Sequence, residues 1–381
     1  MAAPCILPGL RWAPILLALL ATPAAGAEDI PDPAWLRGEL EAVRAAHGLP
    51  ALAAAVVSHG RIIAASAVGV RRLGSPVPVT RVDRFHLGSI AKPMTATLVA
   101  LCVQSGDLGW QTTMGEMFPE LAGTMQPAYR GVTVAQLLAH RSGMPYQPVT
   151  SEAVTDRRGH DAPSRRYEYV KAALLDPPEA PPGTKFIYGG GPVIVASFLE
   201  RKLGTPYETL MRERLFTPLG MTTAAFGNMA SVGTTDGPWE HEWKDGRFIP
   251  VAPRTLQAVQ ARAPVGRNVV CSVIDLARFA QLHLDGAHGR AHLLLPGDFA
   301  VMHTPLPGDR TSPGWMVEAM TWSGANTLWH NGSTGLNQAA CTIGVQRDFA
   351  VCVMANAGGE PAGKACDEVQ FWIGDYLARQ P

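Results

Sequence analysis

The first clear pattern in the chain is a pair of short apolar runs with strand character. Residues 51–58 and 61–69 are rich in Ala, Val and Ile, and His59 and Gly60 separate them. Two such runs around a two-residue turn predict a β-hairpin. A helix is predicted just before this hairpin, with Asp32 as its cap and Pro33 as its first residue, because apolar residues recur there at helical spacing, at Leu36, Leu40 and Val43.

A helical pattern replaces the strand pattern from Ser89 onward. Met94, Leu98 and Leu101 lie on one face of the first helix, which is expected to end near Gly106. Three further helical stretches follow between Pro- and Gly-rich loops, at residues 134–139, 192–203 and 272–284. Long loops at residues 150–164 and 223–250 are expected to shape a substrate cleft.

Strand character returns near the end of the chain. The late strands are predicted at residues 315–322, 327–330, 339–345 and 349–355, and a closing helix at 364–377. Strands at both chain ends around a helical middle predict an α/β (α+β) fold with one antiparallel sheet flanked by helices. Residues 28–88 and 311–381 would form the sheet domain, and residues 89–310 an inserted, mainly helical domain.

Residues 1–27 have the composition of a secretory signal peptide. Arg11 supplies a positive charge, residues 15–21 an apolar run, and Ala25-Gly26-Ala27 the small residues of a cleavage site. A membrane anchor needs about 20 apolar residues, whereas here Pro14 and Pro23 interrupt a shorter stretch. We therefore expect cleavage near Ala27 and a periplasmic or secreted protein without a stable membrane anchor.

The overall charge and composition exclude several classes of protein. Lys and Arg number 32, as do Asp and Glu, so the formal net charge is zero. This balance gives no electrostatic attraction to nucleic acid, and none is expected as a partner. With 47% hydrophobic and 17% charged residues, the chain is neither disordered nor fibrous.

Five cysteines remain after the signal peptide with Cys5 is removed: Cys102, Cys271, Cys341, Cys352 and Cys366. Their spacing fits no zinc site. Cys341 and Cys352 would face each other in a hairpin of the two last strands, which leaves a cross-strand disulfide open. The alternative, small apolar core residues and no essential disulfide, is favoured.

Ser89 and Lys92 form the first candidate for catalysis. A spacing of three places both side chains on one helical face, about 5–6 Å apart at Cβ. Serine is a weak nucleophile that needs a neighbouring base, and a lysine with a lowered pKa can supply it. With 14 Ser and 6 Lys, the chain contains a chance Ser-x-x-Lys about 0.2 times. The alternative is a capping serine followed by a solvent-facing lysine.

The wider sequence context resembles the serine β-lactamase and penicillin-binding-protein superfamily. The matching segments, in order, are residues 84–92 (RFHLGSIAK), 132–145 (VTVAQLLAHRSGMP), 182–188 (PGTKFIY), 263–266 (APVG) and 330–333 (HNGS). The resemblance extends over about residues 40–376 and is greatest to the class C β-lactamase-like branch, which includes DD-peptidases, D-amino-acid peptidases and carboxylesterases.

This resemblance implies roles for further residues. Tyr188 would be the tyrosine of the Tyr-x-Asn motif and would relay protons, its pKa lowered by Lys92. His330 and Gly332 would belong to the third motif, on the strand at the cleft edge. The backbone N–H groups of Ser89 and Ser333 would form the oxyanion hole. His140 would be structural, bonding a nearby backbone group.

Two positions depart from the family pattern. Gly190 stands where the family has the Asn of Tyr-x-Asn, and Asn331 stands where relatives carry a Thr or Ser hydroxyl. In the family these groups contact the acylamide and the carboxylate of a substrate. Their loss predicts weaker binding of β-lactams and peptide carboxylates, and so favours an esterase.

Other candidate motifs carry less weight. His283, His288 and His292 form a loose group, which we interpret as surface histidines because no matched carboxylate or clean i, i+4 pair accompanies them. The run at residues 189–191 is no dinucleotide fingerprint, Gly-x-Ser-x-Gly is absent from the sequence, and no cofactor is implied.

The sequence therefore predicts an exported serine hydrolase that forms an acyl-enzyme at Ser89 and hydrolyses small-molecule esters or amides, with a carboxylesterase favoured. One alternative is a β-lactamase or DD-peptidase. Another, of a different class, is a penicillin-binding sensor that acylates and turns over slowly. The sequence leaves the oligomeric state open.

Overall fold

The computed structural model describes residues 26–146, 161–254, 265 and 268–379. The predicted signal peptide lies outside the described residues up to Ala25, and so does most of the predicted loop at 150–164. The same holds for the 263–266 motif except for Val265, which is buried.

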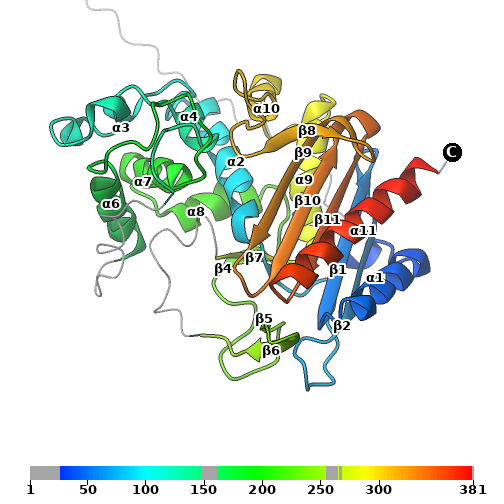
Figure 1. Cartoon of the computed structure of the whole chain (residues 1–381). Coiled ribbons are helices and arrows are strands. Elements are labelled where there is room, and N and C mark those ends of the chain that lie inside the picture. Colours follow the sequence, from blue (N-terminus) through cyan, green and yellow to red (C-terminus); the bar gives the residue numbers. More distant parts are fainter. Residues whose placement is uncertain (1–25, 147–160, 255–264, 266–267, 380–381) are drawn as a thin grey trace, which may run out of the picture.

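A six-stranded antiparallel sheet unites the two ends of the chain (Figure 1). Its strand order is β2-β1-β11-β10-β9-β8. The strands are β1 (Ala51–Ser58), β2 (Arg61–Gly69), β8 (Met316–Met320), β9 (Gly324–Ser333), β10 (Gln338–Gly344) and β11 (Phe349–Ala355). The predicted hairpin is confirmed, with His59 and Gly60 both at positive φ. The predicted α/β fold with a sheet from both chain ends is confirmed as well.

The sheet carries helices on both faces. Helices α1 (Ala34–Ala46) and α11 (Glu360–Ala378) cover the outer face, and α9 (Val273–Ala287) packs against the inner one (Figure 1). Successive side chains of a strand point to opposite faces, so Leu52, Ala54 and Val56 join the outer core, and Ala53 and Ala55 the inner core. The small side chains of Ala53, Ala54 and Ala55 let the helices on both faces approach the sheet closely.

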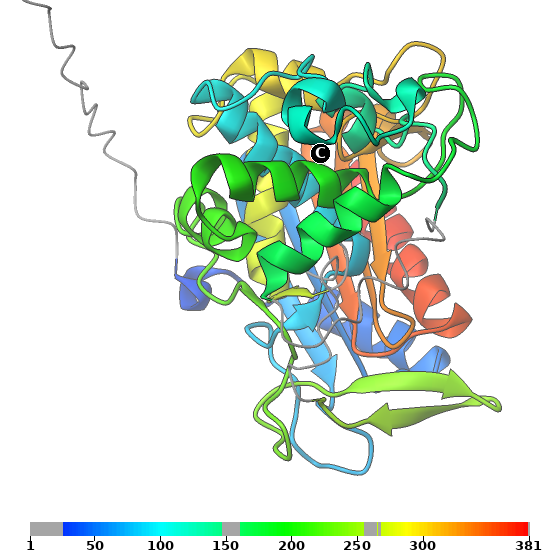
Figure 2. The ribbon, with the colours of Figure 1, turned by 90° about the vertical axis from the view of Figure 1, so that its left-hand side faces the viewer.

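The middle of the chain folds into a group of helices beside the sheet (Figures 1 and 2). They are α2 (Ala91–Gln104), α3 (Met114–Met117), α4 (Val134–Leu138), α6 (Ala162–Ala173), α7 (Gly191–Leu203), α8 (Tyr207–Met211) and α10 (Pro296–His303). Helix α2 is buried on nearly all sides, because its own apolar residues are spread around its circumference instead of lying on one face. The domain division at residue 310 stays a prediction; α9, from within residues 89–310, packs on the sheet.

Two details of the predicted elements are wrong. Pro33 is the N-cap of α1, so the helix begins at Ala34, one residue later than predicted. The predicted loop at residues 223–250 contains strand β4 (Ala225–Phe226) and most of a hairpin formed by β5 (Glu240–Lys244) and β6 (Arg247–Val251). A further small sheet joins β3 (Phe85–His86), β7 (Val269–Cys271) and β4.

The five described cysteines are all buried with free thiols, as expected of core residues. Cys341 and Cys352 lie opposite each other on β10 and β11, with their sulfurs 4.0 Å apart. Within the described ranges, no helix is both long and apolar enough to cross a membrane.

The interpretation of His283 as a surface residue is wrong. Its side chain is fully buried, and its ring nitrogens lie 3.0 Å from the Thr97 hydroxyl and 3.0 Å from His303 Nε2. His288 and His292 are both exposed, so for these two the prediction of surface histidines is confirmed. The described part of the chain holds no group of three or more side chains suited to bind a metal ion.

Candidate active site

Ser89 lies in a tight turn between strand β3 and helix α2. Residues Gly88–Ile90 form one turn of 3-10 helix, and α2 continues from Ala91. The Lys92 ammonium lies 3.1 Å from the Ser89 hydroxyl oxygen, to which it donates. Because α2 is a core helix, Lys92 is only 9% exposed. The two residues predicted for catalysis therefore meet at the buried start of one helix.

Tyr188 reaches the same place from an irregular segment just before α7. Its phenol shares a hydrogen bond with Ser89, and Lys92 Nζ lies 4.6 Å from the centre of its ring. Burial raises the pKa of Tyr188 to about 12, although the hydrogen bond from Ser89 lowers it. The expectation that Lys92 would lower this pKa is wrong, and Tyr188 is a neutral phenol at pH 7.

His140 holds the segment that carries Tyr188. Its carbonyl oxygen accepts the N–H of Ile187 at 2.9 Å, and its ring Nδ1 accepts the N–H of Gly189 at 3.2 Å. The imidazole lies 4.4 Å from the Tyr188 ring, centre to centre. Burial, and then Lys92 and His330, lower the pKa of His140 well below its ordinary value. A neutral imidazole with its proton on Nε2 thus fixes both neighbours of Tyr188.

His140 also has an uncommon backbone conformation. Its φ is +59°, in the left-handed region that non-glycine residues rarely adopt. In this conformation the carbonyl and the ring of one residue face the same segment.

Two glycines bring the backbones of Ser89 and Ser333 together. A Cβ on Gly332 would lie 1.9 Å from the carbonyl oxygen of Leu87 and 2.8 Å from Ser89 N. A Cβ on Gly88 would lie 2.4 Å from Ser333 N. Only glycine permits this approach, which places the two backbone nitrogens predicted for the oxyanion hole beside each other.

The end of β9 forms an open edge beside this turn. Strand β8 pairs with β9 only as far as Trp329, so residues 330–333 have a partner only in β10 among the described strands. His330 lies opposite Cys341, on the inner face with the catalytic candidates. Burial, then Lys92, lower its pKa to about 4, so His330 is neutral at pH 7.

The side chain of Asn331, one of the two positions that depart from the family pattern, points away from Ser89. Asn331 pairs with Ala340, whose side chain belongs to the outer core. Paired residues of an antiparallel ladder point to the same face, so the Asn331 side chain lies on the face opposite Ser89. The structure thus brings His330, Gly332 and Ser333 to the nucleophile, but it does not bring the Asn331 side chain there.

Gly190 lacks a side chain because another residue occupies the space. A Cβ at this position would lie 1.9 Å from the hydroxyl oxygen and 2.8 Å from Cζ of Tyr169, a fully buried residue of α6. The next residue, Gly191, is equally constrained, since a Cβ there would lie 2.0 Å from the Leu137 carbonyl. The packing of Tyr169 therefore leaves no room at this position for the Asn of the family motif.

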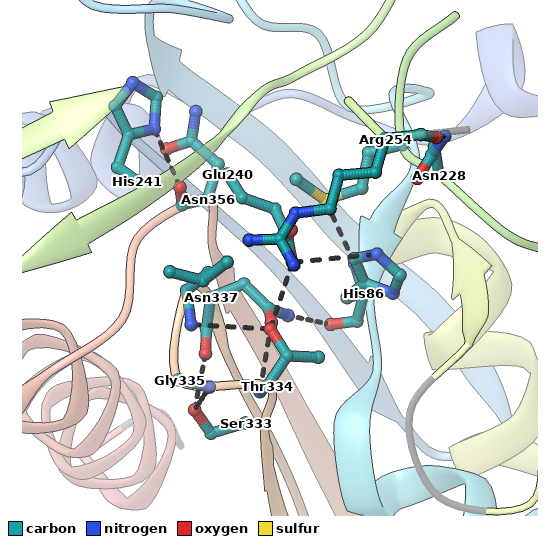
Figure 3. A network of polar contacts seen from close by, with 12 residues as sticks. His86, Asn228, Glu240, His241, Arg254, Ser333, Thr334, Gly335, Asn337 and Asn356 are labelled. Carbon is teal, nitrogen blue, oxygen red and sulfur yellow. Dashed lines mark hydrogen bonds and ion pairs between the residues drawn. The ribbon is translucent and has the colours of Figure 1, made fainter. Parts of the chain in front are cut away.

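Sequence reasoning missed the residues that support these groups. One indirect sign of Tyr169 was present in the sequence, namely the glycine at position 190 in place of the motif Asn. In the polar network around the end of β9, His86 lies within the matching segment 84–92, whereas Glu240 and Asn337 had no signal, because these residue types are common in turns and strand ends (Figure 3).

Comparisons of the sequence with known proteins agree with the resemblance to β-lactamases and penicillin-binding proteins. The β-lactamase family profile matches residues 36–371. The chain is 28% identical to penicillin-binding protein 4 of Amycolatopsis lactamdurans over 80% of each chain. It is 27% identical to a lovastatin esterase of Penicillium rubens over 46% of this chain and 48% of that protein.

Solved structures share the fold. An octameric penicillin-binding protein homologue from Pyrococcus abyssi superposes with a TM-score of 0.72 at 21% identity, covering 90% of this chain and 77% of the other. A D-stereospecific amidohydrolase from Streptomyces sp. superposes with a TM-score of 0.67 at 20% identity, covering 90% and 99%.

Proposed function

The chain belongs to the β-lactamase family of serine hydrolases, and from that premise we propose that it hydrolyses small carboxylic esters through an acyl-enzyme on Ser89. The observation that carries the proposal is the meeting of three groups: the Ser89 hydroxyl, the Lys92 amine 3.1 Å from it, and the Tyr188 phenol hydrogen-bonded to it. A nucleophile in contact with two proton carriers is what acyl transfer requires.

The proposed first step forms the acyl-enzyme. Ser89 Oγ bonds to the carbonyl carbon while its proton passes to the neutral form of Lys92. The negative oxygen that develops is stabilised by the N–H groups of Ser89 and Ser333. The bond to the leaving alcohol then breaks, and the alcohol oxygen takes a proton relayed from Lys92 through Tyr188.

Hydrolysis repeats the sequence with water. A water proton passes to Lys92 as the water oxygen attacks the acyl carbon, and the bond to Ser89 Oγ breaks. Ser89 regains a proton from Lys92 through Tyr188, and the carboxylic acid leaves. Because the pKa of Tyr188 is about 12, its phenol acts as a proton donor and relay, and Lys92 is the base.

The two departures from the family pattern favour esters over β-lactams and peptides. Gly190 presents no amide group, because Tyr169 occupies the space of its side chain. Asn331 points to the far face of the sheet, so it offers nothing to a substrate carboxylate. An acylamide or carboxylate bound here would lose hydrogen bonds that water provides. The similarity to a lovastatin esterase agrees with this preference.

A second candidate function is supported by the longer of the two sequence similarities. The relative that matches 80% of this chain is a penicillin-binding protein, which favours a β-lactamase or DD-peptidase. A slowly turning-over penicillin sensor would differ from both in forming a stable adduct.

The test compares two substrates and one variant. Wild type and Ser89→Ala are assayed on p-nitrophenyl butyrate and on a chromogenic cephalosporin. Ester turnover lost in the variant, with little cephalosporin turnover, is the expected result. Efficient cephalosporin turnover would instead establish the β-lactamase alternative, and a stable adduct seen by intact mass would establish the sensor. Full activity of Ser89→Ala would overturn the assignment of the nucleophile.

We also propose export, with removal of residues 1–27. The support is the charged start, the short apolar run and the small residues before Glu28. Intact mass of protein expressed in a secreting host checks this, and a mass corresponding to a start at Glu28 is expected. A mature protein that retains Met1 would contradict it.

A further inference from the structure

Asn337 joins the two chain segments that meet at Ser89, although it belongs to none of the family motifs. It is fully buried in the turn between β9 and β10. Its side-chain Nδ2 donates to the carbonyl of His86 at 2.6 Å, and its Oδ1 accepts the N–H of Thr334 at 3.2 Å and the Thr334 hydroxyl. Its own carbonyl accepts the Ser333 hydroxyl at 2.7 Å.

These bonds reach both halves of the oxyanion hole (Figure 3). Thr334 directly follows Ser333, whose N–H is one proposed donor. His86 stands three residues before Ser89, whose N–H is the other. The Ser333 hydroxyl oxygen also accepts the N–H of Gly335 at 2.9 Å. This bond tightens the turn that begins at Ser333, whose backbone N–H is the proposed donor.

Further polar contacts surround the same turn. Glu240 of β5 accepts the Thr334 hydroxyl at 3.0 Å and lies 3.7 Å from His86 Nε2. The hairpin β5–β6 thus contacts both segments that Asn337 connects. Asn337 bonds to each of them directly, through one rigid amide group.

We propose that Asn337 is a positioning residue of the oxyanion hole, which sets the distance between the N–H groups of Ser89 and Ser333. The inference rests on the proposed acyl-enzyme function. Gly88 and Gly332 allow the two backbones to approach each other, and the Asn337 amide sets the distance at which they are held. An amide is suited to this role because it donates to one segment and accepts from the other.

The position matters because oxyanion stabilisation depends on geometry. Donors act when they lie at hydrogen-bond distance from the oxygen of the tetrahedral intermediate, and a displacement of about 1 Å costs up to about 100-fold in rate. Loss of Asn337 would leave the carbonyl of His86 and the N–H of Thr334 without this partner, so the two segments can move apart. Substrate binding in the ground state depends less on this spacing than the transition state does.

The experiment compares two buried asparagines. Asn337→Ala is measured beside Asn356→Ala, since Asn356 is also fully buried but donates to backbone carbonyls at Val70 (3.4 Å) and Arg71 (3.2 Å), which lie in neither of the two segments that Asn337 connects. We expect kcat on p-nitrophenyl butyrate to fall about 30- to 100-fold in Asn337→Ala with KM within about threefold. Asn356→Ala should keep kcat within about twofold, with a comparable loss of urea stability.

A boronic acid supplies a readout that a merely structural role would not change. It forms a tetrahedral adduct with the nucleophilic serine, so its inhibition constant should rise in Asn337→Ala by the same factor as kcat/KM falls. Asn337→Asp, which keeps the shape and an acceptor for Thr334, serves where the alanine variant does not fold. It should show a loss of the same kind, because aspartate lacks the donor to the His86 carbonyl.

Two results would overturn the inference. One is unchanged kcat and boronate affinity in the folded Asn337 variant, and the other is an equal loss in the Asn356 control. The Ser89→Ala variant distinguishes a failure of this inference from a failure of the proposed function. If Ser89→Ala is inactive while the two asparagine variants behave alike, only the role of Asn337 fails; if Ser89→Ala is active, the acyl-enzyme itself fails.

Discussion

Two segments hold the reactive serine, and they are built in different ways. The strand arm, residues 330–337, is the end of a sheet strand and the turn after it. The loop arm, residues 186–191, carries Tyr188 and has no regular structure before α7. The strand arm is fixed by its ladder with β10 and by Asn337. In the loop arm, two hydrogen bonds to one residue, His140, hold the residues on either side of Tyr188.

This difference separates two tasks of the site. Donors for the developing oxyanion need fixed positions, and a hydrogen-bonded strand end provides them with little freedom. A proton relay needs its hydroxyl within hydrogen-bond reach of the groups it serves, and the loop arm meets this need with hydrogen bonds on either side of Tyr188. We therefore expect changes in the strand arm to have larger effects on rate than changes in the loop arm.

The largest effect is expected from Gly332→Ala in the strand arm. Its Cβ would lie 1.9 Å from the Leu87 carbonyl, where backbone atoms cannot yield cheaply. The turn that carries Ser89 must move, so kcat should fall by about 100- to 1000-fold, as when an oxyanion donor is lost. Ester hydrolysis measures this.

Gly363→Ala is the matched control for that variant. Gly363 lies in α11, and a Cβ there meets nothing within 4 Å. It should retain full activity and slightly raise stability, because alanine favours the helix. Wild-type activity of Gly332→Ala would contradict the strand arm's role.

A smaller effect is expected from His140→Asn in the loop arm. Asparagine tolerates positive φ, so the backbone at φ +59° is kept while the imidazole acceptor for Gly189 is lost. We expect kcat to fall about 10- to 100-fold, because Tyr188 is no longer held.

A double-mutant cycle identifies the cause of that loss. In a Tyr188→Phe background, His140→Asn should lower kcat by less than about twofold more, because both changes disable the same relay. Fully additive losses in the cycle would show that His140 acts independently of Tyr188, and the loop arm would then need another account.

Gly190→Ala tests the packing of the loop arm. The added methyl group meets the Tyr169 hydroxyl at 1.9 Å, so unfolding free energy should fall by about 1–3 kcal/mol, as in other overpacked sites. In a Tyr169→Ala background the same change should cost much less. Urea unfolding of the four proteins measures the coupling, and equal costs in both backgrounds would exclude this clash.

The effect that is smallest at neutral pH concerns the uncharged histidine of the strand arm. Burial lowers the pKa of His330 to about 4 from the ordinary 6.5. Between these values the unfolded chain binds a proton that the folded chain does not, so stability rises with pH there. The slope from this group is at most about 1.4 kcal/mol per pH unit. Urea unfolding between pH 4 and 7 should show a smaller slope in His330→Gln, and an unchanged slope would mean that another group titrates.

Much of the fold followed from local patterns. The hairpin at residues 51–69 and strand β11 have the predicted bounds, because alternating small and β-branched residues around a short turn leave few other structures. The helix start at Pro33 and the hairpin β5–β6 were missed, since caps and surface strands carry weak sequence signals. The burial of His283 was missed because two of the rings around it, Phe299 and Trp315, come from other segments of the chain.

The sequence by itself determined the sheet from both chain ends, the helical middle and the placement of Ser89 and Lys92 on one helix start. These follow from short-range periodicity and from a spacing of three, which act within one element. Only the tertiary structure decided that burial raises the pKa of Tyr188, that Asn331 faces away from Ser89, and that Tyr169 excludes a side chain at Gly190. Each of these depends on burial, register or packing between segments far apart in the chain, and such long-range contacts leave no periodic trace in the sequence.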